Sequence, residues 1–487
     1  MLKSYDPRTG EFVGEYPIRD AAAVADVVRS ARKAQTWWAA AGFAGRKRSM
    51  LSWKRHISRN AVELAELIST ETGKPTVDAA IEVMLAVEHL NWAARHAERF
   101  LGRARLSPNW LTRNQSASVG YLPLGVVGVL GSPNNPLLSS MGAIAYAMAA
   151  GNAVVFKPSQ FTPGVGTWLA ESWAALGPDL PVLQTITGTL DTSAELCRAR
   201  VDKIAYAGSE EGARQAIEFC APTFTPIVVE KAGKGTMIVH VDADLDAAAD
   251  AAVFGAMSNA GQNPAGIQRA YVAASVYDSF LERVVVQARS LRPGADRRAS
   301  YGPMIVESQV DVVRRQVKDA IARGGRAVVG GLESIREPYI EPIVLTEVPE
   351  HALAVTTEAL GPVLIVNRVT DIDDAIDRIN RAGQGVSVSV FTRDVAAVEE
   401  FAERIRTGVV MVNSSMTYAT NPAVPFGGVG EYGQGHIHGE AGLREFSRTL
   451  AITRKRHRTL VDLSSFDRPI RHLRLTRGLF RLRHGRF

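Results

Sequence analysis

The chain has 487 residues, of which 46% are hydrophobic and 22% are charged, which is typical of a globular protein long enough for about three domains. It contains two cysteines, too few for a disulfide framework or a cysteine metal cluster, and no histidine spacing indicates a metal site. The net charge of +6 comes from the C-terminal tail, where eleven Lys and Arg stand against two Asp from residue 454 onward. The remainder is slightly acidic, which argues against a nucleic-acid partner.

The first residues, MLKSYDPRTG, lack the basic and apolar segments of a signal peptide, so we predict a reduced, cytoplasmic protein. Residues 1–100 have the periodicity of helices. RDAAAVADVVRSARKAQTWWAA and AVELAELISTETGK both carry apolar residues three and four positions apart. Asp20 is a candidate N-cap for the first of these helices.

Residues 114–156 contain no charged side chain, but the turn residues GSPNNP at 131–136 interrupt this stretch. The short β-rich runs GVVGVL, NAVVF, VLQTIT, KIAYAG and PIVVE alternate with helical segments from residue 125 to about residue 239. We therefore predict the buried strands of a parallel, doubly wound α/β sheet rather than a membrane span. Such a sheet binds ligands beyond the carboxyl ends of its strands.

A second α/β segment extends from about residue 242 to residue 421. It contains the β-rich runs RAYVAA, GRAVVGG, PVLIVNRV, VSVSVF and GVVMVN. The amphipathic helices SQVDVVRRQVKDAIARGG and DIDDAIDRINRAG each end near a glycine. No short-period repeat or low-complexity linker separates the two halves, so the boundary near residue 240 is gradual.

Five ordered sequence blocks resemble the aldehyde dehydrogenase superfamily over roughly residues 3–453. They are GVVGVLGSPNNP, AGNAVVFKPSQFTP, VVEKAGK, TEALGPV and PFGGVGEYGQGHIHGEAG, the last being similar to the class 3 branch. The resemblance implies an aldehyde dehydrogenase-like α/β fold with a Rossmann-type dinucleotide-binding domain at 1–110 and 125–240. It also implies a catalytic-type α/β domain at 241–425, a small β oligomerisation element at 111–124 and 440–455, and a homodimer. Residues 456–487 follow as a basic tail.

The resemblance implies that NAD or NADP binds at the strand ends. It assigns Lys157 to the adenosine ribose, with a solvated surface lysine as the alternative. Gln160 replaces an acid that in the family binds the ribose hydroxyls, and a neutral amide there would tolerate the 2′-phosphate of NADP. Gly208 and Ser209 end a strand and begin a helix whose N–H groups suit a pyrophosphate.

This cofactor site departs from the family in several positions. Gly212 lies one position early, and Glu210 and Glu211 place carboxylates beside the expected phosphates, although both acids favour the helix itself. Glu358 resembles the acid that holds the nicotinamide ribose, and Leu360 replaces an aromatic residue beside it. We therefore expect that NAD or NADP binds at this site, with an affinity that Glu210 and Glu211 lower.

The nucleophile is missing. In the family a cysteine thiolate attacks the aldehyde, hydride leaves for the nicotinamide, and a glutamate activates the water that hydrolyses the thioester. In SNAGQNPAGIQRAYV, Gly261, Gln262 and Arg269 set the register that puts Pro264 at the cysteine position. Proline offers neither a thiol nor the backbone N–H that serves the family as second oxyanion donor, so the resemblance implies that position 264 does not support the thioester route.

Other catalytic positions are kept. Glu230 matches the general base, with a structural carboxylate at a strand end as the alternative. Asn134 matches the asparagine that faces the oxyanion, with a plain turn asparagine as the alternative. Asn263 and Phe426 would line the substrate pocket, with a core phenylalanine as the alternative for Phe426.

The tail DRPIRHLRLTRGLFRLRHGRF interleaves arginines with apolar residues at helical spacing. Such a helix can lie on an anionic membrane surface, and class 3 relatives sometimes carry C-terminal anchoring tails. The protein would then be peripheral to the membrane. Docking on the acidic body and a frayed, solvated tail are the alternatives.

Three functions are compatible with these features. An NAD(P)-dependent oxidoreductase without covalent catalysis would take hydride from an aldehyde hydrate or another carbinol while Glu230 takes the proton. A catalytically inactive pseudoenzyme would serve as a scaffold or as a membrane-surface or partner-binding protein. The third function is an ordinary aldehyde dehydrogenase whose nucleophile has moved to Cys197 or Cys220, although both positions have the pattern of packed helix residues.

Overall fold

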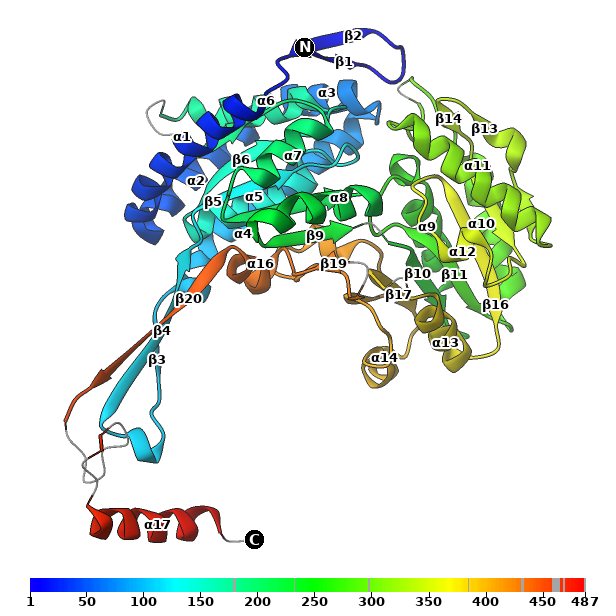
Figure 1. Ribbon diagram of the computed structural model, residues 1–487. Helices are drawn as coiled ribbons and strands as arrows, with labels where there is room; N and C mark the ends of the chain where they lie inside the picture. Colours follow the sequence, from blue (N-terminus) through cyan, green and yellow to red (C-terminus); the bar gives the residue numbers. More distant parts are fainter. Residues whose placement is uncertain are drawn as a thin grey trace. The chain divides into compact units, whose positions relative to one another are not determined.

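A computed structural model describes residues 1–177, 181–231, 233–296, 298–383, 385–430, 433–457, 465–466 and 469–485. The chain forms two compact units (Figure 1). The first comprises Met1–Phe100 and Pro123–Ser447, and the second comprises Leu101–Leu122 and Arg448–Phe487.

The N-terminal hundred residues contain a hairpin as well as helices. Strands β1 (Leu2–Tyr5) and β2 (Phe12–Tyr16) pair antiparallel, and this hairpin was not predicted from the sequence. Helices α1 (Ala21–Ala40), α2 (Gly42–Arg59), α3 (Ala61–Thr72) and α4 (Thr76–Leu101) follow. The predicted N-cap is confirmed, because the Asp20 carboxylate accepts the N–H of Ala23 at 2.9 Å.

A six-stranded sheet has the order β19-β9-β8-β5-β6-β7. Its strands are β5 (Val126–Leu130), β6 (Ala153–Lys157), β7 (Leu183–Thr185), β8 (Lys203–Gly208), β9 (Ile227–Lys231) and β19 (Gly433–Gln434). All of these pair in parallel except β19, which is antiparallel to β9. The predicted parallel α/β sheet is thus confirmed. Its helices are α5 (Leu138–Ala150), α6 (Pro163–Ala174), α7 (Leu190–Arg198) and α8 (Glu210–Cys220).

A second sheet of seven strands has the order β12-β15-β16-β11-β10-β17-β18. These strands are β10 (Gly235–Val239), β11 (Ile267–Ala273), β12 (Arg326–Val329), β15 (Ile343–Thr346), β16 (Val363–Val369), β17 (Ser387–Phe391) and β18 (Val409–Val412). In this sheet β12 is antiparallel to β15, and the other neighbouring strands pair in parallel. Its helices include α9 (Leu245–Met257), α10 (Tyr277–Ser290), α11 (Glu307–Ala322), α13 (Ile372–Ala382) and α14 (Val395–Ala402).

Shorter elements complete the first unit: β13 (Ile335–Arg336), β14 (Tyr339–Ile340), α12 (Leu353–Thr356), α15 (Thr417–Thr420) and α16 (Gly439–Glu445). The second unit holds a three-stranded sheet of β3 (Ala104–Leu106), β4 (Gln115–Pro123) and β20 (Ser447–Lys455), followed by helix α17 (Ile470–His484). Within the described ranges, no helix is both long enough and apolar enough to cross a membrane.

Candidate functional site

Two cavities lie where the first sheet ends and loops from the second half of the chain approach it. We call the first, of about 490 Å³, cavity A. It begins at the carboxyl ends of β5 and β8 and at the start of α8, and residues 306–312 and 357–360 contribute to its wall. The carboxyl ends of parallel strands are the usual place for a ligand in this architecture.

Four of the six predicted cofactor residues line cavity A: Gly208, Ser209, Glu358 and Leu360. Lys157 and Gln160 are not among its lining residues, although Ser159 and Phe161 are. Lys157 ends strand β6 and is 6% exposed, and burial lowers its pKa to about 8. It is therefore not a solvated surface lysine. Gln160 is exposed between two residues that line cavity A, and its tolerance of a 2′-phosphate stays a prediction.

Tyr206 packs against Gly208 and Gly212 at the start of α8. Its hydroxyl donates to the backbone oxygen of Ser209 at 3.0 Å, and the hydroxyl of Ser209 caps the helix by accepting the N–H of Gly212 at 3.3 Å. A Cβ atom at Gly208 or Gly212 would lie 2.4 or 2.2 Å from the Tyr206 hydroxyl oxygen. Both glycines thus allow the Tyr206 hydroxyl group its present position, and this tyrosine also lines cavity A.

Glu210 and Glu211 line cavity A, as the sequence predicts. The carboxylate of Glu210, however, forms ion pairs with Lys231 at 2.8 Å and with Arg214 at 2.7 Å. These two cations lower its pKa and offset its charge beside a bound anion. This ion pairing was not predicted from the sequence, although Lys231 directly follows Glu230 at the end of β9 and a lysine there could have indicated a partner for a nearby carboxylate.

Glu358 is partly buried in the wall of cavity A. Burial raises its pKa to about 7, and the nearby cations Lys231 and Lys234 oppose this shift. Its backbone oxygen accepts the side-chain amide of Gln316 at 3.1 Å, which ties the segment to α11. At neutral pH this carboxyl group can therefore both donate and accept hydrogen bonds.

We call the second cavity, of about 240 Å³, cavity B. Glu230, Asn263 and Pro264 line it together, and Pro264 also lines cavity A. Pro264 is therefore part of the wall that the two cavities share. Glu230 lies near the end of β9 and keeps some accessible surface toward the cavity. Its depth in the protein nevertheless raises its pKa to about 8 through burial.

The loop before Pro264 has an unusual backbone. Asn259, Ala260 and Gly261 have φ values of 53°, 56° and 71°, which is the left-handed region that few non-glycine residues adopt. The side-chain amide of Asn263 donates to the backbone oxygen and the hydroxyl of Ser258, both at 3.0 Å. Asn263 therefore holds the loop as well as lining cavity B.

Asn134 is 5% exposed and lines cavity A. Its backbone oxygen accepts the ammonium group of Lys74 at 2.8 Å and the amide of Asn259 at 3.0 Å. Lys74 also forms a buried ion pair with Glu82 at 2.7 Å, and the Glu82 carboxylate accepts the N–H of Leu137 at 2.9 Å. These contacts fix the turn. Sequence reasoning missed Lys74 and Glu82, because no local pattern links α4 to residues 134–138.

Phe426 differs from its predicted place. It is 1% exposed and is not among the residues that line cavity B. Its ring stacks on Tyr418 with a centroid distance of 4.4 Å, and Tyr418 does line the cavity. The core alternative therefore describes Phe426, and Tyr418 is the aromatic wall residue that the sequence analysis overlooked.

The two cysteines lie away from both cavities. Cys197 on α7 and Cys220 on α8 are buried, and neither lines cavity A or cavity B. The hydrogen-bonded thiol of Cys220 and burial raise the pKa of Cys197 above its ordinary value. A thiol that stays protonated is a poor nucleophile, whereas the same hydrogen bond lowers the pKa of Cys220. A relocated nucleophile is disfavoured because neither thiol lines cavity A or cavity B.

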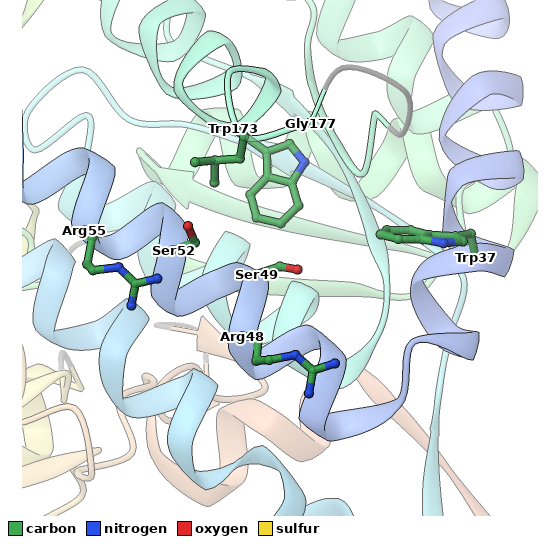
Figure 2. Close-up of a pocket in the computed structure, with 8 residues that line it drawn as sticks. Trp37, Arg48, Ser49, Ser52, Arg55, Trp173 and Gly177 are labelled. Atoms are coloured by element: carbon green, nitrogen blue, oxygen red, sulfur yellow. The ribbon is translucent and has the colours of Figure 1, made fainter.

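A third cavity, of about 510 Å³, lies at α1, α2 and α6 (Figure 2). Figure 2 shows Ser49 and Ser52 on α2 below the indole of Trp173 in this view, the Arg48 and Arg55 side chains extending away from it, and Trp37 at one end. Its lining residues are Trp37, Arg48, Ser49, Ser52, Arg55, Trp173, Leu176 and Gly177. No predicted site residue is among them, so the candidate site is the pair of cavities that share Pro264.

Comparisons with known proteins agree with this geometry. The profile of the aldehyde dehydrogenase family matches residues 1–452. A probable succinate-semialdehyde dehydrogenase, NADP(+), from Sinorhizobium fredii is 31% identical over 91% of this chain and 90% of its own length.

Solved structures resemble this chain over nearly its whole length. An NAD-dependent aldehyde dehydrogenase from Sinorhizobium meliloti has a TM-score of 0.89 and 30% identity, over 95% of this chain and 93% of that one. An NADP-dependent glyceraldehyde-3-phosphate dehydrogenase from Bacillus halodurans, complexed with NADP, has a TM-score of 0.88 and 26% identity, over 94% and 96%. The chain, with its α/β fold, belongs to the aldehyde dehydrogenase family.

Proposed function

We propose that this chain is an NAD(P)-dependent oxidoreductase that oxidises aldehydes as their hydrates, without a covalent intermediate. The observation that carries the proposal is that Pro264, at the position proposed for the nucleophile, lines both cavities while Glu230 lines cavity B. A hydrate held at this shared wall would have Glu230 on the side of cavity B and the cofactor on the side of cavity A.

NAD or NADP, bound in cavity A, supplies the hydride acceptor. Family membership supports this cofactor, and the similar structures include an NAD-dependent enzyme and a complex with NADP. The residues fit the group, because the start of α8 offers N–H groups suited to a diphosphate and Lys231 offsets Glu210. Ser209, Glu358 and Leu360 would hold the cofactor, and Lys157 keeps its assignment to the ribose.

The proposed chemistry needs no thiol. Glu230 would take a proton from one hydroxyl group of the hydrate, and the electron pair of that O–H bond would form the second carbon–oxygen bond. The electron pair of the carbon–hydrogen bond would leave as hydride, for which the bound cofactor would be the acceptor. The products are a carboxylic acid and the reduced cofactor. The side-chain amide of Asn134 keeps its proposed role of stabilising the substrate oxygen. Because the pKa of Glu230 is about 8, this base becomes available as the pH rises through 8.

Steady-state kinetics test the proposal. The purified protein is mixed with a panel of aldehydes and with NAD or NADP, and the reduced cofactor is followed by absorbance. We expect slow formation without an initial burst, since no acyl-enzyme accumulates, and no inhibition by thiol alkylation. Glu230→Gln should lower the rate by about 10²–10⁴-fold. Absence of reduced cofactor with every aldehyde of the panel would refute the proposal, even if calorimetry detects cofactor binding.

Helix α17 favours a second candidate function, a membrane-surface protein without turnover. Arg474, Arg477 and Arg481 lie on one helical face at three- and four-residue spacing. Leu475, Leu479 and Leu482 lie on another face and are 57%, 50% and 61% exposed. A helix with a basic and an apolar face suits an anionic lipid surface.

Sedimentation with vesicles tests this second candidate. The full chain should pellet with phosphatidylserine-containing vesicles and should be released by salt. The Arg474→Glu/Arg477→Glu variant should stay in the supernatant. Failure of the unchanged chain to pellet at low salt rules out this candidate.

We also propose a homodimer that forms through residues 111–124 and 440–455. Strand β20 is an outer strand of the three-stranded sheet and is largely exposed, and such an edge is suited to pairing between chains. We further propose that the domains divide at residues 110, 125 and 240. Analytical ultracentrifugation should give twice the mass of one chain. A monomer at micromolar concentration would refute the dimer.

A further inference from the structure

Apolar side chains form much of the wall of cavity B. Ile81 and Leu85 come from α4, Phe254 comes from α9, and Met416 and Tyr418 lie at α15. Ile81 and Phe254 remain 45% and 56% exposed, although large apolar side chains gain free energy when they leave water. An apolar ligand that enters the cavity would cover them, as in most small-molecule sites.

The cavity offers no available cation. Among the described residues that line it, Lys74 is the one lysine, and no arginine is present. An ammonium group has three donors, and those of Lys74 reach the carboxylate of Glu82 at 2.7 Å, the backbone oxygen of Asn134 at 2.8 Å and the side-chain oxygen of Asn135 at 3.1 Å. His438 also lines the cavity, and burial lowers the pKa of its imidazole well below the ordinary value, so it is uncharged. A ligand carboxylate would therefore find no cationic donor among the described lining residues.

The cavity also presents carboxyl groups of its own. Asp78, in the first turn of α4, and Glu230 both line it. The ion pair with Lys74 and the N–H groups of Leu137 and Leu138 already engage Glu82. Burial raises the pKa of the Asp78 carboxyl group, and Lys74 opposes this shift. As a carboxylate Asp78 repels an incoming anion, which costs free energy in a partly buried site, and in neither form does it offer a positive charge.

We propose that cavity B takes uncharged aldehydes with an apolar chain and discriminates against aldehydes that carry a carboxylate at the far end. This specificity rests on the proposed function, since it assumes that the aldehyde carbon lies near Glu230. It would separate this chain from the relative named for succinate semialdehyde, whose substrate name denotes a carboxylated aldehyde.

Calorimetry with unreactive alcohols tests the specificity directly. The full chain, without cofactor, is titrated with 1-heptanol and with 7-hydroxyheptanoate, which differ by a terminal carboxylate. We expect heptanol to bind at least about ten-fold more tightly, which corresponds to about 1.4 kcal/mol. Equal binding, tighter binding of the carboxylate, or no binding of either alcohol would overturn the proposal.

Two variants assign the preference to the cavity. Asp78→Asn should reduce the preference for heptanol at least about three-fold, because it removes the like charge. Asp250→Asn is the matched control: Asp250 is exposed on α9, one turn before Phe254, and does not line cavity B. If both variants change the preference equally, or if Asp78→Asn changes nothing, the proposal fails.

A third variant keeps the test decisive if Asp78→Asn does not fold. Phe254→Ser alters an exposed rim residue and should weaken heptanol binding while leaving that of 7-hydroxyheptanoate unchanged. Equal loss for both ligands would count against an apolar site. These titrations do not measure turnover, so absence of reduced cofactor would refute the proposed function, whereas loss of the preference refutes this specificity alone.

Discussion

Pro264 takes part in the hydrogen bonds of its loop through its backbone oxygen alone. The backbone oxygen of Pro264 accepts the N–H of Gly233 at 3.0 Å. The neighbouring bonds of the loop belong to other residues, since Gly266 donates its N–H to Asn263 at 3.1 Å and the Asn263 amide donates to Ser258. A residue without an N–H therefore fits here and leaves these loop bonds intact.

Pro264→Cys is expected to give partial aldehyde dehydrogenase activity. The thiol would lie on the wall shared by the two cavities and would come with a backbone N–H, although the geometry that activates a thiolate in the family is not thereby restored. The measurement is a burst of reduced cofactor that thiol alkylation abolishes. Pro264→Ala is the matched control, because it restores the N–H without a thiol. A Cys variant no faster than the Ala variant contradicts the expectation.

Glu230→Gln should stabilise the protein at alkaline pH. Burial raises the pKa of Glu230 from 4.5 to about 8, so between these values the native state binds a proton that the unfolded chain has lost. This group therefore makes stability fall as pH rises from about 4.5 to 8. The variant should gain about 2–4 kcal/mol at pH 8 and nothing at pH 4.5.

Denaturant unfolding at the two pH values measures this difference. Glu98→Gln, at an exposed glutamate on α4, serves as the control and should change stability little at either pH. A destabilised Glu230→Gln protein at pH 8 would show that the carboxylate form is the one that the fold favours.

At the scale of elements, the parallel strands were predictable because apolar runs such as residues 126–130 are short, β-rich and separated by helical segments. The N-terminal hairpin was not. LKSY and FVGEY lack an apolar run, and a distant contact helps to hold the hairpin. The hydroxyl of Ser4 donates to the carboxylate of Glu71 at 2.7 Å. Contacts between residues so far apart in the chain leave no local pattern.

The start of α8 yields a prediction about its fit to Tyr206. Gly212→Ala would place a Cβ atom 2.2 Å from the Tyr206 hydroxyl oxygen, so either the Tyr206 side chain or the first turn of the helix must shift. We expect cofactor affinity to fall by about ten-fold in calorimetry. Adding Tyr206→Phe removes the hydroxyl group and should recover most of the loss.

Gly478→Ala is the control for this helix substitution, because a Cβ atom there meets nothing within 4 Å. It should leave cofactor affinity unchanged. If Gly212→Ala binds the cofactor as tightly as the unchanged protein, the start of α8 does not hold the diphosphate.

At the scale of the whole molecule, both cavities combine residues from distant parts of the chain. Residues at strand ends, such as Gly208 and Glu230, were found because a polar residue after an apolar run marks the ligand edge of a sheet. Lys74, Glu82 and Tyr418 were missed. Their side chains reach the cavities through packing between elements, which periodicity does not encode.

Cofactor binding should stabilise the native chain as a whole. A ligand at 100 times its Kd that binds only the native state adds about 2.7 kcal/mol. NAD and NADP should shift the unfolding midpoint similarly, since Gln160 is exposed and outside cavity A. The test is denaturant unfolding with each cofactor at matched saturation, measured against the Gly212→Ala protein. A shift with one cofactor and none with the other would reveal a discriminating residue elsewhere.

The loop before Pro264 takes its course from the left-handed residues Asn259, Ala260 and Gly261 and from the amide of Asn263. Cellular quality control removes chains that unfold, and it does not detect missing chemistry. On the proposal that Pro264 stands at the nucleophile position, a chain without the thiol would therefore still be abundant and well folded. Descendants of one ancestor can then diverge into catalytic and non-catalytic branches while natural selection preserves the scaffold that they share.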